Sequence, residues 1–323
     1  MPSPNTSFTE LVTTTLRKRS KSLADNVTQN TALLQRLKKK GNVRPFNGGR
    51  TIVEELFYAE NGTYQRYSGY ETLNITPQDV ITAAEFEMKL AAMSVSISGE
   101  ELLKNSGEEQ VIDLLEARIK NAEMSFANNL SADCYSDGTA SGGKQIGGLQ
   151  ALVSDAGTGT VGGINSSTYS WWQNQIFDFS SNSLTPSSTT IQTAMNRLYL
   201  ACSRNADKPD LIVADNIYFR YYWESLQAIQ RIQSVSEGAA GFDSLKFMGA
   251  DVVFDGGIGG DAPASHMYFL NTNYIHFRPH SDRNMTLIGG ERQSVNQDAI
   301  VRLVGWAGNM TISNRSLQGV IVA

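Results

Sequence analysis

The side chains that most often carry catalysis or bind metals are few in this sequence. There are two cysteines, Cys134 and Cys202, and three histidines, His266, His276 and His280. Neither cysteine belongs to a CxxC pair or has a histidine close to it in the sequence, so the pattern signals neither a zinc site nor a disulfide framework. We expect both cysteines to be buried as small apolar residues.

His276 and His280 have the spacing of an HxxxH metal pair on a helix, but Pro279 between them and the alternation over 274–277 indicate a strand. On a strand the two rings would lie about 13 Å apart, too far to share a metal. Asp282 leaves a weak ion site as an alternative, and polar packing at a strand end is favoured. The sequence predicts no metal and no cofactor.

Residues 157–162 (GTGTVG) match the GxGxxG fingerprint of dinucleotide sites. That fingerprint must follow a strand and open a helix, because the phosphates bind at the helix N-terminus. Residues 163–170 are poor helix formers and no apolar strand precedes Gly157, so we do not expect a nucleotide site. No Gly-x-Ser-x-Gly elbow, Walker lysine loop or HExxH motif occurs. The chain is predicted not to be an enzyme.

Composition predicts a folded protein, because 41% apolar and 18% charged residues are ordinary values for 323 residues. No apolar run could span a membrane and no secretory signal is recognisable, so a cytoplasmic location is the default and no membrane partner is expected. Charge is unevenly distributed, with a net +8 over residues 1–50 and −13 over the rest. A basic arm on an acidic body suits nucleic acid, an acidic neighbour or both; a solvated helix face is the alternative.

Two basic clusters lie among loosely helical leucines within residues 1–49. Gly41, Pro45 and Gly48 then interrupt any helix, so we expect residues 1–49 to form an arm with little core of its own. Such an arm needs a partner surface to become ordered. The candidate subunit-interface or DNA-facing residues here are Arg17, Lys18, Arg19, Lys21, Lys38, Lys39 and Lys40.

Residues 50–98 are expected to form a long two-stranded hairpin. Strand patterns at 51–58 and 84–89 flank an aromatic run with Asn-Gly, Ser-Gly and Thr-Pro turn signals. An isolated hairpin is marginal in water, so this one is expected to lie on another chain. Its tyrosines complete the set of candidate interface residues: Tyr64, Tyr67 and Tyr70.

The clearest helix is predicted over 108–130, after a capping box that begins at Ser106. Its apolar stripe, about 30 Å long, consists of Val111, Leu115, Ile119, Ala122, Phe126 and Leu130. A glycine- and serine-rich, loop-dominated stretch follows to about residue 170.

The second half of the chain predicts an α+β unit. A second helix should bury Ile191, Ala194, Met195, Leu198, Ala201 and Cys202. A short buried strand over 210–214 follows. Asp215 should cap a third helix that carries Phe219, Trp223, Leu226, Ile229 and Ile232. Strands are then predicted over 245–247, 250–254, 267–270, 274–278, 299–304 and 309–312.

From the glycine-rich region to the C-terminus the sequence resembles major capsid proteins of tailed bacteriophages of the Hong Kong 97 type. The phrases that carry this resemblance, in order, are IGGLQALV (146–153), GTVGGIN (159–165), YSWW (169–172), DLIVA (210–214), LKFMGADVVF (245–254), MYFLNTNY (267–274), WAGNM (306–310) and NRSLQ (314–318). Their order along the chain is more specific than any single phrase.

The resemblance implies an α+β capsid fold with four parts. Residues 1–49 would be an N-terminal arm, 50–98 an extended β-hairpin loop (E-loop), and about 140–275 an axial domain. The peripheral domain would hold residues 99–139, with the spine helix at 108–130, and about 276–323. Self-assembly as pentamers and hexamers would form an icosahedral head in the virion around double-stranded DNA, after assembly in the host cytoplasm.

The resemblance also suggests a cement or decoration protein, a scaffold and a portal as candidate partners. We do not carry over two further properties of the family. No lysine lies between Arg50 and Ala84 that could form a crosslink from the hairpin tip, and the arm is too short for a scaffolding domain. The alternatives are an encapsulin-like compartment shell, a β-rich binding protein such as an adhesin or tail component, and, least supported, an enzyme.

Overall fold

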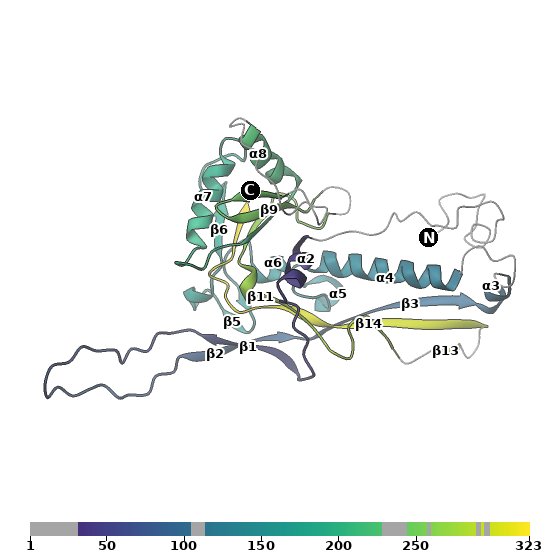
Figure 1. Ribbon diagram of the computed structural model, residues 1–323, viewed down its shortest axis with the longest axis horizontal. Coiled ribbons are helices and arrows are strands. Elements are labelled where there is room, and N and C mark those ends of the chain that lie inside the picture. Colours follow the sequence, from purple (N-terminus) through teal and green to yellow (C-terminus); the bar gives the residue numbers. More distant parts are fainter. Residues whose placement is uncertain (1–31, 105–113, 228–243, 257–259, 289–291, 294–297) are drawn as a thin grey trace.

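The computed structural model describes residues 32–104, 114–227, 244–256, 260–288, 292–293 and 298–323. Figure 1 shows three parts: a lobe that contains helices α7 and α8, a long slab in which α4 runs beside β3 and β14, and a hairpin that projects in the opposite direction. These parts correspond to a six-stranded sheet, a five-stranded sheet and a two-stranded ladder.

The slab is built on one long strand, β14, which covers Ala299–Ile312. It pairs antiparallel with β3 over ten consecutive residue pairs, from Ala299↔Ser98 to Gly308↔Lys89. The other elements of the slab are β3 (Lys89–Ser98), α3 (Gly99–Lys104), α4 (Leu114–Asp133), β11 (Ile275–Pro279), β12 (Thr286–Leu287) and β13 (Arg292–Gln293). Strands β11, β12 and β13 pair with β14 as well.

We expected two strands, 299–304 and 309–312, with residues 305–308 outside them. One continuous strand is found instead. Its middle residues Trp306 and Ala307 are buried and pair with Ala91 and Leu90 of β3, so the ladder continues through the glycines. Backbone pairing with a long partner strand therefore joins the two predicted segments into one strand.

Helix α4 lies against β3 and buries Ala122 and Phe126 of the predicted stripe. It extends to Asp133, three residues beyond the predicted end, while the predicted start at 108 lies outside the described residues. Arg118 on α4 bonds Glu101 of α3 at 3.0 Å, and the capping box of α3 forms, with Ser98 and Glu101 exchanging backbone-to-side-chain hydrogen bonds.

The six-stranded sheet has the order β6-β15-β10-β7-β9-β8. Its strands are β6 (Gln175–Asp178), β7 (Leu211–Ala214), β8 (Ser244–Phe247), β9 (Ala250–Phe254), β10 (Met267–Leu270) and β15 (Gly319–Val322). Strands β7 and β10 are buried throughout, as uninterrupted apolar runs predict for a sheet covered on both faces. Ile212 and Ala214 pack in the core under α7 and α8, and Leu211 and Val213 pack in the core on the opposite face.

The two helices of the lobe are α7 (Ile191–Ala201) and α8 (Asn216–Gln227). Asp215 caps α8 as predicted, since its Oδ1 accepts the Tyr218 N–H at 2.9 Å. The predicted inner residues of α7 are buried except Ala201, which is exposed at the helix end. In α8 the fully buried residues are Tyr218 and Tyr222, one turn apart, and Phe219 and Trp223 are only half-buried.

Strand β15 was not predicted. It pairs parallel with β6 and antiparallel with β10, so the C-terminal residues 319–322 lie in the six-stranded sheet of the lobe. A Cβ on Gly319 would lie 2.6 Å from Cys202 Sγ, so only glycine permits this close approach to α7.

The projecting hairpin consists of β1 (Thr51–Phe57) and β2 (Ile81–Glu87), in register from Thr51↔Glu87 to Phe57↔Ile81. We expected the hairpin to extend to Ser98. Its ladder ends at Glu87, because residues 89–98 form β3 and pair with β14. The outgoing strand therefore passes directly from the hairpin into the slab.

The glycine-rich region contains only short elements. These are α5 (Ala140–Gly143), α6 (Leu149–Leu152), β4 (Thr160–Val161), β5 (Ile164–Asn165) and the 3-10 turn η1 (Ser170–Trp172); a second 3-10 turn, η3, covers Thr272–Tyr274. Within the described residues, no helix is both long and apolar enough to cross a membrane.

The arm departs from expectation in its last third. Helix α2 (Ala32–Lys39) packs on the chain's own core, with Leu33 and Leu37 fully buried. Residues 43 and 46 then form single parallel bridges to Phe277 and His280 beside β11. Because α2 is amphipathic and its leucines find an apolar surface on the same chain, residues 32–46 need no other subunit to be ordered.

Candidate functional site

The hairpin root is attached to the body by one face of its two strands. Ile52 and Leu56 of β1 and Ala84 and Phe86 of β2 are buried in the larger core. Glu54 Oε1 lies 3.5 Å from Arg278 Nη1 and accepts a hydrogen bond of 2.8 Å from Thr311 Oγ1. Both apolar burial and an ion pair therefore fix the direction in which the hairpin leaves the body.

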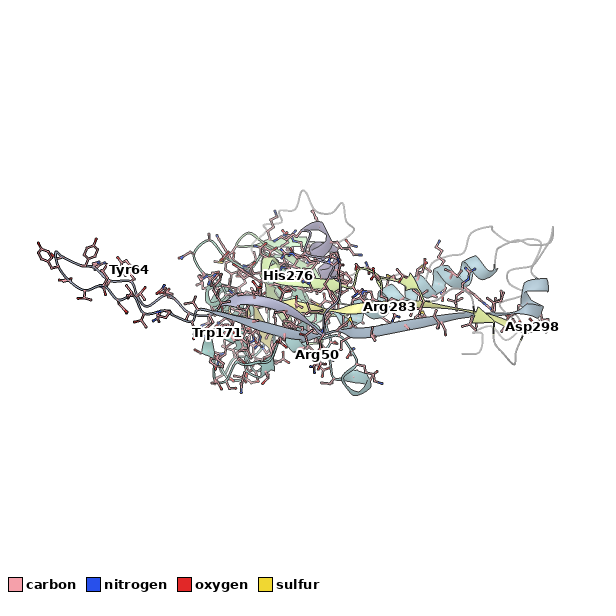
Figure 2. The ribbon with its side chains drawn as sticks, turned by 90° about the horizontal axis from the view of Figure 1, so that it is seen from below. Arg50, Tyr64, Trp171, His276, Arg283 and Asp298 are labelled. Atoms are coloured by element: carbon pink, nitrogen blue, oxygen red, sulfur yellow. The ribbon has the colours of Figure 1, made fainter. Side chains whose placement is uncertain are left out.

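The distal part of the hairpin, residues 58–80, extends far from the body, as Figure 2 shows for Tyr64. Its internal contacts are local: Tyr58 N–H donates to Val80 O at 3.1 Å, and Gln65 Nε2 donates to Thr72 O at 3.1 Å. The exposed apolar side chains are Tyr64 (81%), Tyr67 (65%), Tyr70 (108%), Leu73 (48%) and Ile75 (90%). So many apolar residues exposed on one projecting segment indicate a surface that another molecule covers.

The lysines of the second basic cluster lie at the end of α2. Lys38 and Lys39 are exposed. Lys40 Nζ lies 2.8 Å from Asp210 Oδ2 and donates to Asn273 Oδ1 at 3.1 Å, so this lysine is engaged within its own chain. The first cluster, Arg17, Lys18, Arg19 and Lys21, lies outside the described residues.

Acidic residues at the ends of strands β7 and β9 hold α2 against the lobe. Arg36 Nη2 lies 3.4 Å from Asp210 Oδ2 and 3.2 Å from Asp251 Oδ2. Asp255 accepts a hydrogen bond from the backbone of Ala32, at the start of α2. Carboxylate at the helix N-terminus and basic residues near its C-terminus both complement the helix dipole. Sequence reasoning missed this attachment because the acids follow α2 by about two hundred residues.

Asp255 is part of a buried polar pair. Its Oδ2 accepts a hydrogen bond of 2.5 Å from Tyr135 Oη. Burial raises the pKa of the Asp255 carboxyl above its usual value and holds the pKa of Tyr135 well above that of a free phenol. Tyr135 lies two residues after α4 and Asp255 directly follows β9, so the pair connects slab and lobe.

Arg315 is a second buried polar group that the sequence did not reveal. It is fully buried, and its guanidinium donates to Leu152 O at 2.7 Å, Trp172 O at 3.0 Å and Asn174 Oδ1 at 2.8 Å. Burial lowers the pKa of Arg315 to about 10. The three acceptors lie in or next to the glycine-rich region, whose sequence favours no regular secondary structure. Hydrogen bonds from this one arginine therefore fix the conformation of these loops.

The histidines do not form a site. His276 is buried in β11, where burial and nearby Arg44 lower its pKa below the usual value, while His280 packs edge-on against Phe46. His266 Nε2 lies 3.0 Å from Asp155 Oδ2. Among the described residues, no group of three His, Cys, Asp or Glu side chains could hold a metal ion. Both cysteines are free thiols and fully buried, as predicted.

The GxGxxG segment also lacks a nucleotide-binding geometry. Residues 160–165 form the small β4–β5 hairpin, and no helix begins there. Gly162 lies against the hairpin root, where an added Cβ would meet Ala84 Cβ at 2.8 Å, and its carbonyl accepts the Glu85 N–H at 2.9 Å. Glycine at position 162 therefore allows the backbone of this hairpin to approach β2 closely.

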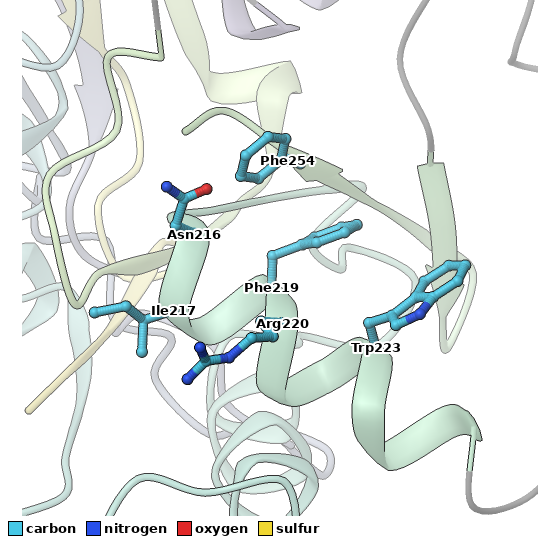
Figure 3. Close-up of a pocket in the computed structure, with 6 residues that line it drawn as sticks. All are labelled: Asn216, Ile217, Phe219, Arg220, Trp223 and Phe254. Carbon is cyan, nitrogen blue, oxygen red and sulfur yellow. The ribbon is translucent and has the colours of Figure 1, made fainter. Parts of the chain in front are cut away.

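Two of the clefts that the described residues form are open to solvent. The larger, about 560 Å³, lies on α8 and is lined by Asn216, Ile217, Phe219, Arg220, Trp223 and Phe254. Figure 3 shows the aromatic rings on one side of it and the Arg220 guanidinium turned away from them. The smaller, about 180 Å³, lies at the hairpin root beside Tyr58 and Trp171. Neither combines a nucleophile with a base.

The architecture was compared with those of known proteins. No protein-family profile and no curated protein sequence matches the chain. The capsid protein of cyanophage A-1(L) superposes with a TM-score of 0.69 at 17% identity, over 95% of this chain and 96% of that one. The chain has the fold of tailed-phage major capsid proteins.

Other solved structures share this capsid fold at lower similarity. A chain of the Mycobacterium phage Bobi structure has a TM-score of 0.56 at 14% identity, over 95% of both chains. The holo-SrpI encapsulin complex from Synechococcus elongatus has the same TM-score, 0.56, at 8% identity, over 98% of this chain and 95% of that one. The fold is thus shared by a cyanophage capsid and an encapsulin complex.

Proposed function

We propose that this chain is the major capsid protein of a tailed double-stranded DNA phage, with a structural and not a catalytic role. The observation that carries the proposal is a capsid fold matched over 95% of the chain, combined with a projecting hairpin whose apolar side chains are exposed. A monomer would leave that surface in water, whereas a shell covers it with neighbouring copies.

The mechanism is repeated self-association. Copies related by rotation bury the hairpin of one subunit on the next, and such heterologous contacts close into pentamers and hexamers. Hairpin residues Tyr64, Tyr67 and Tyr70 supply large contact areas at low cost in conformational entropy. The shell is the virion head, assembled in the host cytoplasm, with decoration, scaffold and portal proteins as candidate partners.

The parts of the subunit follow from this assignment. Residues 1–49 form the arm, and the hairpin within 50–98 is the E-loop. The peripheral domain consists of residues 99–139, which include the spine helix α4, and most of 276–323. The axial domain is about 140–275, joined by β15. Basic residues of the arm, including Lys38 and Lys39, face packaged DNA and stabilise it without reading bases.

An encapsulin-like compartment is the second candidate, because the encapsulin complex matches the chain over 98% of its length. The two differ in what the shell encloses. Expression of the chain, followed by negative-stain electron microscopy and sedimentation velocity, should give closed shells or pentamers and hexamers. A stable monomer, also in the presence of the proteins encoded beside it, would contradict both candidates. Nucleic acid inside shells from infected cells supports the phage assignment, and a protein cargo supports the compartment.

A further inference from the structure

His266, directly before β10, lies between two hydrogen-bond acceptors. Its Nδ1 is 2.7 Å from Ala264 O, and its Nε2 is 3.0 Å from Asp155 Oδ2. The His266 side chain is only 16% exposed, and its ring stacks on Tyr268 with the two centroids 5.9 Å apart. The ring is therefore held at both of its nitrogen atoms.

Both contacts together require the protonated form of the ring. A backbone carbonyl oxygen and an ionised carboxylate can only accept hydrogen bonds, so each ring nitrogen must carry a hydrogen atom. A neutral imidazole carries one, and its other nitrogen would present a lone pair to an oxygen atom. Burial opposes the charge of His266, but the hydrogen bonds to Asp155 and Ala264 outweigh it and hold the pKa of His266 above its usual value of 6.5.

Within the described part of the chain, the charged groups that face the ring are the carboxylates of Asp155 and Asp215. Asp215 is engaged elsewhere, since its Oδ2 accepts the Ser265 N–H at 2.7 Å and its Oδ1 accepts the Tyr218 N–H at 2.9 Å. Asp155 belongs to the glycine-rich region, and its side chain is 47% exposed. The proton on His266 therefore decides the position of Asp155 and not that of Asp215.

The segment that contains Asp155 leads to the hairpin root. Ser154 is fixed by Asn174, whose Nδ2 donates to Ser154 O at 2.9 Å. The chain then reaches the β4–β5 hairpin, where Gly162 O accepts the Glu85 N–H of β2 at 2.9 Å. The contact between Asp155 and His266 joins this segment to the six-stranded sheet, so its loss should loosen the support of β2.

We infer that His266 is a pH-dependent clasp between the lobe and the glycine-rich segment 154–162. The protonated ring binds Asp155 and holds the segment against the lobe. The neutral ring releases Asp155, and the segment beside the hairpin root becomes more mobile. The clasp lies within one subunit, so it goes beyond the proposed assembly and does not depend on it.

The direction of the pH effect follows from the raised pKa of His266. Below pH 6.5 the ring is protonated in the folded and in the unfolded chain, and the clasp contributes its full stability. The contribution is lost as the pH rises through the pKa of the folded state. The remaining hydrogen atom stays on Nδ1, because the exposed Asp155 side chain can turn into water whereas the Ala264 carbonyl cannot.

Hydrogen exchange at two pH values tests the clasp. Mass spectrometry of the full chain at pH 6 and pH 9 gives the protection of the backbone amides in 154–162, corrected for the intrinsic exchange rate. Protection should fall by about threefold or more at pH 9, and the amides of 84–86 in β2 should follow by a smaller factor. Strand β7 is buried throughout and serves as the internal reference, whose protection should stay constant.

Two substitutions should remove the pH dependence. In Asp155→Asn the amide can accept a hydrogen bond from the protonated ring and donate one to the neutral ring, so protection should be equal at both pH values. His266→Gln should also give no transition, because an amide does not titrate. His280→Gln is the matched control and should keep the transition of the parent, since this ring packs against Phe46 instead.

Three results would overturn the inference. The parent could protect residues 154–162 equally at both pH values. The transition could persist in His266→Gln or in Asp155→Asn, which would assign it to another group. His280→Gln could abolish the transition, which would place the titrating group beside Phe46. None of these measurements needs shells, so failure of the clasp is distinguishable from failure of the proposed function.

Discussion

Glu54 of the hairpin and Arg278 of β11 face each other across the junction between hairpin and body, with Oε1 and Nη1 3.5 Å apart. Their side chains are only 12% and 19% exposed. Thr311 of β14 donates to the same carboxylate oxygen, so three strands meet at this group. The ion pair therefore couples the direction of the hairpin to the sheet on which the subunit is built.

Substitution Glu54→Gln should lower the free energy of unfolding by about 1–3 kcal/mol, because Arg278 then loses its partner in a largely buried position. Glu55→Gln is the matched control on the exposed face of the same strand and should change the free energy of unfolding by less than about 0.5 kcal/mol. Urea denaturation of dissociated subunits measures both. Equal effects of the two substitutions would contradict the assignment.

Shortening the hairpin should separate folding from assembly. Tyr58 N–H bonds Val80 O, so residues 59–79 can be replaced by Asn-Gly, a two-residue turn that suits such a ladder. We expect a folded subunit with an unchanged thermal midpoint that forms no shells. A milder variant, Tyr64→Ser with Tyr67→Ser and Tyr70→Ser, should reduce shell yield in the same assay. Normal shells from the shortened chain would refute a role of the distal loop.

Truncations of the arm should differ in stability according to whether they end before or after α2, which begins at residue 32. The sequence suggested that residues 1–49 form an arm with little core of its own, but α2 buries Leu33 and Leu37 in the core. Removal of 1–31 should therefore leave the subunit folded, whereas removal of 1–45 should cost several kcal/mol, as loss of two buried leucines does. Thermal unfolding compares the two truncations. Equal midpoints would show that α2 contributes no stability.

Replacement of Arg315 by methionine leaves three buried acceptors without their donor. We expect a loss of about 2–4 kcal/mol in the free energy of unfolding. Arg315→Lys keeps the charge but cannot reach all three acceptors with a planar group, so its effect should be intermediate. Faster proteolysis within residues 140–175 should accompany the loss, because the guanidinium holds loops there. An unchanged proteolysis pattern would contradict this role.

The Glu101–Arg118 pair should make stability depend on pH in acid. The hydrogen bond from Arg118, with that from the Ser98 backbone, lowers the pKa of Glu101 from 4.5 to about 2. Because the folded state holds the lower pKa, the contribution is complete above pH 4.5 and disappears as the pH falls towards 2. Glu101→Gln should therefore destabilise the subunit more at pH 6 than at pH 3, measured by urea denaturation. Glu123→Gln, on the exposed face of α4, should show no such difference.

The sequence by itself determined the elements whose signals are local. The apolar period of α4, the cap at Asp215 and the apolar run of β7 predicted their structures, because helix spacing, capping and burial on both faces of a sheet act over a few residues. The separation of charge between arm and body and the exposed tyrosines of the hairpin were also evident from the sequence.

Only the tertiary structure decided how these elements are paired. The predicted strands 299–304 and 309–312 form one strand because β3 pairs with the residues between them, and residues 89–98, which we expected in the hairpin, join another sheet. Helix α2 is held against the body because its Arg36 pairs with an acid about two hundred residues later in the sequence. Arg315 likewise donates hydrogen bonds to loops that are distant in the sequence. Such contacts depend on long-range packing, and no local pattern of residue types encodes which partner a strand or a charged side chain will find.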